Sequence, residues 1–147
     1  MKLSDHFTLE ELIISSKAYE LGIDNMPPAV IIANLKLVAN KLEEVRSLFG
    51  KPIGVSSGYR CLTLNRAIGS SDTSQHISGC AADFHIDGFT PGQIVERIIH
   101  SGIEFDQIIE EHLGGHSWVH ISVPLENKKP RKQALIIDEH GTRSWTK

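Results

Sequence analysis

The sequence predicts an α+β fold with an antiparallel sheet flanked by N-terminal helices. Three observations support this class. Apolar residues recur at helical spacing in the first third of the chain, they alternate with polar residues in later segments, and short glycine-containing turns separate those segments. A chain of 147 residues suits one domain with one core. We therefore expect a single domain over residues 1–147, with its core over about 8–123 and a linker and hairpin in 124–147.

Two helices are predicted near the start. Thr8 and Glu11 fit a capping box, which indicates a short helix that reaches about Leu21. A longer amphipathic helix spans residues 29–49 and ends at Gly50. Its apolar stripe consists of Ile31, Leu35, Val38, Leu42, Val45 and Phe49.

The middle of the chain alternates strands and helices. We expect a strand over residues 53–56, a helix over 59–68, a strand over 81–86 and a helix over 91–100. Thr90 is the expected cap of the last helix, because a proline follows it at the first helical position.

The last third predicts two hairpins. Strands over residues 105–111 and 118–123 are joined by LGGHS, which indicates a hairpin with a longer loop. The polar segment LENKKPRK then leads to strands over 133–138 and 142–146, separated by EHG. The basic run KKPRK, residues 128–132, is typical of a solvated loop, although it could also hold an anionic polymer.

Composition excludes several functional classes. A net charge of −3 gives no electrostatic basis for binding nucleic acid or an anionic membrane. The chain has no apolar run as long as a membrane span and no secretory signal at its start. We expect a cytoplasmic protein that leaves the cytosol only if another factor exports or releases it. Cys61 and Cys80 do not form a C-x-x-C pair, so both are expected to stay reduced.

Six of the eight histidines lie between residues 76 and 120, which suggests metal chemistry. Side chains alternate across a strand, so Asp83 and His85 share one face of their strand while Phe84 lies on the other. The same rule places His120 opposite the apolar face of its own strand. Two strands therefore each carry an apolar face and a face with groups that can bind a metal.

A catalytic zinc site needs three protein ligands and one open position for water. His76, Asp83 and His120 can supply these ligands. His85 and His116 are alternatives that spacing alone does not separate.

Three motifs extend this interpretation. SQHISGCAAD has the pattern S-x-H-x6-D, SWVH has the pattern W-x-H, and SSGYRCLTLNRAIGS precedes both. Together they resemble the zinc D-Ala-D-Ala carboxypeptidases and L-alanyl-D-glutamate endopeptidases that act on peptidoglycan, and most closely the small phage and prophage members. The resemblance covers roughly residues 8–123.

The resemblance implies that His76, Asp83 and His120 bind Zn²⁺. It also implies hydrolysis of peptide bonds in peptidoglycan stem or cross-link peptides by a zinc-bound water. Arg60 and Ser74 match the family positions that contact substrate. An arginine suits this role because its guanidinium can hold a carbonyl or carboxylate oxygen by paired hydrogen bonds.

One position departs from the family pattern. Many relatives carry the general base three residues before the last histidine ligand, where this chain has Ser117. Glu111 is the preferred substitute and Glu110 the second choice, since the predicted hairpin can bring either beside His120. If neither carboxylate serves, the alternative is a non-catalytic zinc-containing module that binds the wall or belongs to a phage structure.

Overall fold

The computed structural model describes residues 1–146, so Lys147 of the predicted domain lies outside the described part. Helices dominate its first half and strands its second, which confirms the α+β class. The helices are α1 (Leu9–Ile13), α2 (Ser16–Leu21), α3 (Ala29–Phe49), α4 (Leu62–Ala67) and α5 (Pro91–Ser101). The strands are β1 (Gly54–Ser57), β2 (Ala81–His85), β3 (Gln107–Leu113), β4 (His116–Ser122), β5 (Gln133–Asp138) and β6 (Gly141–Ser144).

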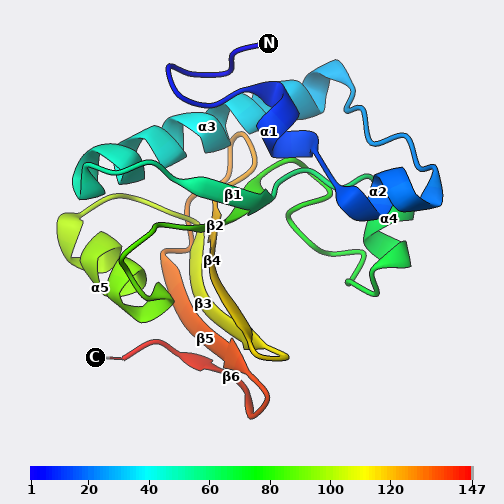
Figure 1. The fold of residues 1–147 in the computed structure, drawn as a ribbon. Coiled ribbons are helices and arrows are strands. Elements are labelled where there is room, and N and C mark those ends of the chain that lie inside the picture. Colours follow the sequence, from blue (N-terminus) through cyan, green and yellow to red (C-terminus); the bar gives the residue numbers. More distant parts are fainter. Residues whose placement is uncertain (147) are drawn as a thin grey trace.

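All six strands form one sheet in the order β1-β2-β4-β3-β5-β6 (Figure 1). The prediction of a purely antiparallel sheet was wrong, because β3 and β5 pair in parallel. The cause is the connection over residues 123–132. Because β4 runs antiparallel to β3, β4 ends at the edge of the sheet where β3 begins. The connection stays at that edge, so β5 starts beside the first residues of β3 and runs in the same direction.

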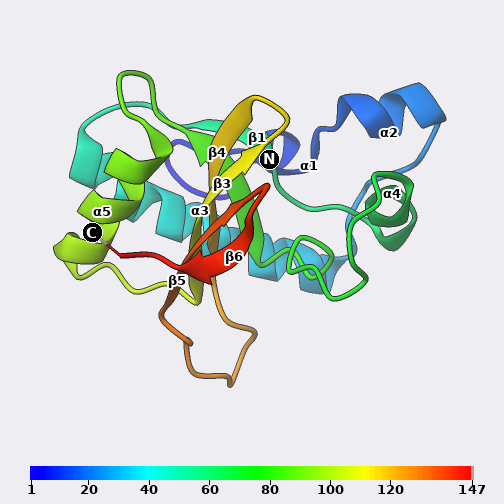
Figure 2. The same cartoon turned by 90° about the horizontal axis from the view of Figure 1, so that it is seen from below.

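The predicted single helix up to Leu21 is also wrong, because the chain forms α1 and α2 instead. Ile14 is extended, with φ −63° and ψ 136°, and Ser15 accepts a hydrogen bond from Ala18 N as a second N-cap. Serine competes with helix continuation by bonding backbone amides in this way. The break places α2 beside α4, away from α3 (Figures 1 and 2).

Helices α3 and α5 pack against one face of the sheet (Figure 2). The residues predicted to face the core, including Phe84 on β2 and Val119 and Ile121 on β4, are buried there. The predicted stripe of α3 packs into the same core from Leu35 to Phe49. Because the helices cover this face, the opposite face of β2 and β4 remains available for polar groups.

The β3–β4 turn is tighter than predicted. Only Gly114 and Gly115 separate the strands, and both have positive φ, 58° and 81°. Two residues with positive φ are typical of the turn that matches the twist of a hairpin. The turn fixes a register in which Glu111 pairs with Trp118 and Glu110 pairs with Val119.

The final hairpin is confirmed as β5 and β6, which extend the same sheet at the side of β3. Within residues 1–146, no helix has the length and apolar character needed to cross a membrane.

Candidate metal centre

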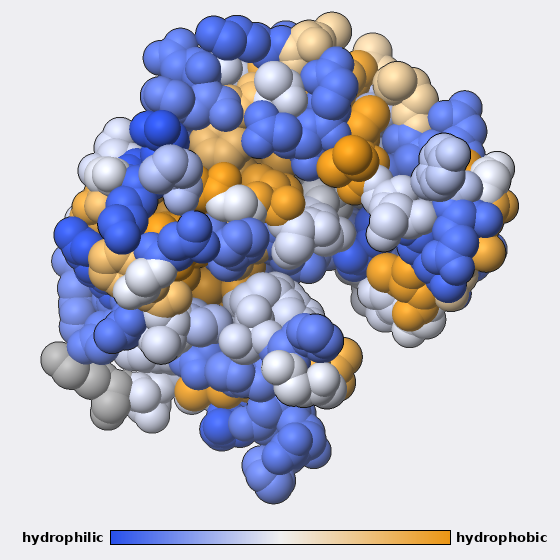
Figure 3. Space-filling view, viewed as in Figure 1, coloured by the Kyte–Doolittle hydropathy of each residue, from blue (hydrophilic) through white to orange (hydrophobic). Residues whose placement is uncertain are grey.

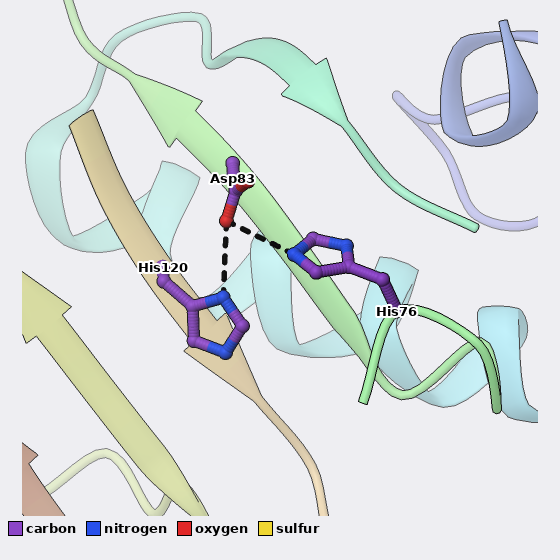
Figure 4. Close-up of side chains that lie close together, drawn as sticks. All are labelled: His76, Asp83 and His120. Carbon is purple, nitrogen blue, oxygen red and sulfur yellow. Dashed lines mark hydrogen bonds and ion pairs between the residues drawn. The ribbon is translucent and has the colours of Figure 1, made fainter. Parts of the chain in front are cut away.

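His76, Asp83 and His120 meet on the face of the sheet opposite α3 and α5 (Figure 4). His76 Nε2 lies 3.2 Å from Asp83 Oδ1, and His120 Nδ1 lies 3.0 Å from the same oxygen. The two imidazole rings are 5.1 Å apart between centroids and inclined at 70°. Three ligand-type atoms therefore converge from two strands and one loop.

Strand pairing positions two of these side chains. Asp83 on β2 is directly opposite His120 on β4, and side chains of opposed residues share a face. The loop before β2 brings in His76. Gly79 in this loop has φ 72° and passes so close to α3 that a Cβ would lie 2.7 Å from Ile31 Cγ2. The motif glycine therefore allows the histidine loop to pack on the helix.

The orientation of the His76 ring is set by a backbone carbonyl. His76 Nδ1 lies 2.7 Å from Gly58 O, so this nitrogen carries the proton and donates it. When the ring is neutral, Nε2 therefore carries the lone pair, and it is the nitrogen that faces Asp83. Gly58 itself lies against Leu12, where a Cβ would collide with the Leu12 carbonyl oxygen. A histidine oriented by a carbonyl in this way is typical of a metal ligand.

The donor set fits zinc. Two imidazole nitrogens and one carboxylate oxygen, all within 4.8 Å of one another, match the ligands of catalytic zinc sites. His76 and His120 are 3% and 7% exposed, so both imidazole rings are held inside the protein. Although burial alone would raise the pKa of Asp83, the adjacent His76 and His120 hold it well below its usual range. The carboxyl is therefore an anion, as a metal ligand must be.

The two alternative histidines lie outside this cluster. His85 is exposed at the end of β2, and its ring lies against Gly54 on β1. His116 is exposed at the first position of β4, beside the glycine turn. The structure thus places His76 in the cluster and leaves out His85 and His116, the two alternatives that sequence spacing did not exclude.

Glu111 lies on the metal-site face of β3. Its strand partner is Trp118, which shares a face with His120 two residues further along β4. Burial raises the pKa of Glu111, and the Asp83 carboxylate raises it further, while His120 and Arg60 act in the opposite direction. The Glu111 carboxylate accepts no hydrogen bond from any residue between 1 and 146.

Glu110 lies on the opposite face, because it pairs with the buried Val119. Its carboxylate accepts a hydrogen bond from Trp145 Nε1 at 3.0 Å and contacts His112 Nε2 at 2.7 Å. It also lies beside Gly92 in the first turn of α5. These contacts join β3 to α5 and to the C-terminal segment, away from the metal cluster.

Arg60 is held beside the cluster without an ion pair. Its Nε donates to Asn65 Oδ1 at 3.0 Å, and a terminal nitrogen donates to Ser57 Oγ at 2.9 Å. Within residues 1–146 it forms no salt bridge. Burial lowers the pKa of Arg60, while Asp83 and Glu111 raise it, and a guanidinium stays charged at neutral pH. A half-buried cation of this kind is available to an anionic or carbonyl oxygen.

Ser74 links Arg60 to the loop that carries His76. Its hydroxyl accepts a hydrogen bond from His76 N at 3.2 Å and lies 3.5 Å from a terminal nitrogen of Arg60.

Asn25 was not singled out from the sequence, yet its side chain forms hydrogen bonds with the backbone of Ile13, Tyr59 and Cys61. It fixes the segment that carries Arg60. The sequence predicts only that Asn25 lies in a turn. It does not predict the distant backbone groups that Asn25 contacts.

A cleft of about 540 Å³ opens on the other side of Arg60. It is lined by Ser57 and Arg60 near the cluster and by residues of α2 and α4, including Tyr19 and Leu64. Figure 3 shows the surface hollowed between the lobe of α2 and α4 and the β3–β4 hairpin.

The family model for peptidase M15 matches residues 5–122. The chain belongs to the peptidase M15 family. Peptidase M15 proteins are metallopeptidases, typically with zinc, and the His76–Asp83–His120 cluster lies inside the matched region. No curated protein matches the chain.

Proposed function

We propose that this M15 protein is a zinc-dependent peptidase that hydrolyses peptide bonds in peptidoglycan stem or cross-link peptides. The observation that carries the proposal is the His76–Asp83–His120 cluster with two further groups beside it. These are the Glu111 carboxylate and the Arg60 guanidinium; among residues 1–146 the first has no hydrogen-bond partner and the second has no ion pair. Together they supply a metal site, a base and an oxygen-binding cation.

A zinc ion held by His76, Asp83 and His120 would polarise the scissile carbonyl and lower the pKa of a bound water toward about 7. Glu111 is the proposed general base. It accepts the proton of the attacking water and passes it to the amine of the leaving peptide. A raised pKa suits this exchange, because the carboxyl must both take up and release a proton near neutral pH.

Arg60 is the proposed anchor for a substrate oxygen. Ser57, Asn65 and Ser74 hold the guanidinium by neutral oxygens, so its charge is not cancelled. The adjoining cleft can take the peptide beyond that oxygen. Stem peptides carry free carboxylates, which Arg60 can bind through paired hydrogen bonds.

The proposal is tested by release of new amino groups from purified sacculi and from soluble stem peptides. Protein depleted of metal by chelation and the His120→Ala variant should both be inactive, and zinc should restore only the depleted parent. His116→Ala is the matched control, because His116 is exposed on the same strand outside the cluster. Equal activity of the parent, the depleted protein and His120→Ala would contradict the zinc mechanism.

The alternative is a non-catalytic zinc module that binds the wall or belongs to a phage structure. It predicts one zinc per chain and binding to sacculi without release of amines. The location of Glu111 on the metal-site face favours the peptidase instead, since it supplies the carboxylate that Ser117 lacks.

A further inference from the structure

His85 is a histidine on the metal-site face of β2 that the proposed hydrolysis does not use. Its side chain shares a face with Asp83, because residues two apart on a strand point to the same side. His85 is exposed, while the intervening Phe84 is buried in the core. Among residues 1–146, neither ring nitrogen of His85 has a hydrogen-bond partner or an ion pair. This imidazole is therefore free to contact a substrate.

The position of the His85 ring depends on a glycine in the neighbouring strand. Gly54 on β1 pairs directly with His85, and a Cβ on Gly54 would collide with Cε1 and Nε2 of the ring. The ring thus lies across the backbone of β1, in space that any other side chain would fill. Gly54 does not have a positive φ. The ring, and not the backbone conformation, therefore accounts for a glycine at this position.

His85 and Arg60 lie on opposite sides of the metal cluster along β2. Arg60 N donates to His76 O in the loop before β2, and its guanidinium contacts Ser57, the β1 residue opposite Asp83. Figure 4 shows His76 near the start of β2 and Asp83 further along it. His85 lies two residues beyond Asp83, a further distance of about 7 Å along a strand. A peptide that crosses the metal in the direction of β2 meets Arg60 on one side and His85 on the other.

The proposed base lies on the His85 side of the metal ligands. Glu111 pairs with Trp118, two residues before His120 on β4. Since β4 runs antiparallel to β2, this displacement has the same direction as the one from Asp83 to His85. Glu111 is the group proposed to pass a proton to the leaving amine. The leaving peptide therefore extends toward His85.

We propose that His85 binds the backbone of the leaving peptide about two residues beyond the scissile bond, and that the protein is an endopeptidase. A neutral imidazole has one N–H donor and one acceptor, which match the C=O and N–H groups of an extended peptide. A substrate that ends one residue after the bond does not reach His85, because a residue spans only about 3.3 Å. The inference rests on the proposed peptidase function and adds its substrate class, peptides that continue past the cleaved bond.

Two soluble peptides that share the cleaved bond test the proposal. Mass spectrometry of the products of a stem peptide identifies this bond. One test peptide then ends a single residue after the bond, and the other continues for three. The parent should have the higher kcat/KM on the longer peptide. His85→Ala should raise KM on the longer peptide by about five- to tenfold, the effect of a lost hydrogen bond, and leave the shorter one unchanged.

His116→Ala is the matched control, since His116 is also an exposed strand histidine outside the cluster. It should match the parent on both peptides. A parent that cleaves the shorter peptide at least as well as the longer one would overturn the proposal. Equal losses on both peptides in His85→Ala would also overturn it.

Gly54→Ala displaces the imidazole without removing it. It should raise KM on the longer peptide as His85→Ala does, and the double variant should lose nothing further, because both changes act on one contact. Additive losses would overturn the proposal, since His85 would then act without the position that Gly54 allows.

A binding measurement separates this inference from the proposed hydrolysis. In NMR spectra of zinc-loaded Glu111→Gln protein, the longer peptide should shift the His85 ring signals and the shorter one should leave them unchanged. This shift together with an inactive parent would contradict the proposed function but support His85 as a peptide-binding residue. Hydrolysis by the parent without the shift, or no binding of the longer peptide, would overturn the inference about His85.

Discussion

Glu110 and Glu111 are neighbours in the chain with opposite environments. Glu110 faces α5 and the C-terminal segment, where its carboxylate contacts Trp145 and His112. Glu111 faces the metal cluster, is half-buried, and has no hydrogen-bond partner within residues 1–146. The alternation of side chains along β3 alone separates the two.

We propose that this difference separates a structural carboxylate, Glu110, from a functional one, Glu111. A carboxylate whose pKa is raised by burial and by a neighbouring carboxylate is a candidate functional group. Glu110 is satisfied by its neighbours and stabilises the packing of β3. Glu111 is left for a ligand or a reacting water. The same substitution at the two positions should therefore have opposite consequences.

Glu111→Gln should lower kcat by about 10² to 10⁴-fold, because the amide cannot accept the proton of the attacking water. Its stability at neutral pH should rise. The folded-state pKa of Glu111 lies above its usual range, so ionisation destabilises the fold as pH rises through that interval, and glutamine avoids this cost. Steady-state kinetics on a soluble stem peptide and urea unfolding measure the two effects. Parent-like kcat with bound zinc would rule out Glu111 as the base.

The acid limb of the pH profile should report the same group. A general base acts only when ionised, so kcat/KM should fall about tenfold per pH unit below the pKa of Glu111. Burial and Asp83 raise this pKa, which places the limb above the usual range of a glutamate. In Glu111→Gln the residual activity should lack this limb. A limb that persists unchanged in the variant would assign the ionisation to another group.

These two glutamates also show how far the sequence predicts the site. The family resemblance carried by S-x-H-x6-D and the later W-V-H selects His76, Asp83 and His120, whereas strand alternation alone leaves His85 and His116 as alternatives. Glu110 and Glu111 could not be separated with certainty, since their faces depend on a register set by the Gly114–Gly115 turn.

The fold shows the same limit. Periodicity predicts α3, α5 and the inward face of β2 because each depends on local spacing. The parallel pairing of β5 with β3 depends on where the connection over residues 123–132 crosses the sheet. The ion pair between Asp106 and Arg131 holds this connection in place and joins residues 25 positions apart in the sequence. No local sequence pattern predicts it.

Glu110→Gln should leave kcat and KM within about twofold of the parent, because Glu110 lies on the face opposite the metal cluster. It should lower the free energy of unfolding by about 1 kcal/mol, since the amide keeps one acceptor oxygen for the two neighbours Trp145 and His112. A thermal melt should show a decrease in Tm of about 3 °C. A large loss of kcat in a folded Glu110→Gln protein would place Glu110 in the reaction and reverse the comparison.

The smallest predicted effect concerns Asp138, whose pKa is lowered whereas that of Glu111 is raised. Arg143 donates to its carboxylate at 2.8 and 3.1 Å and lowers the pKa of Asp138 to about 2. Stability from this pair is therefore complete above the unfolded-state pKa and is lost as pH falls through about 2. NMR titration of Asp138 should show a midpoint that rises toward the usual aspartate range in Arg143→Gln and, because the pair is on the surface, partly in high salt. An unchanged midpoint in Arg143→Gln would show that partners other than Arg143 hold the pKa of this carboxylate down.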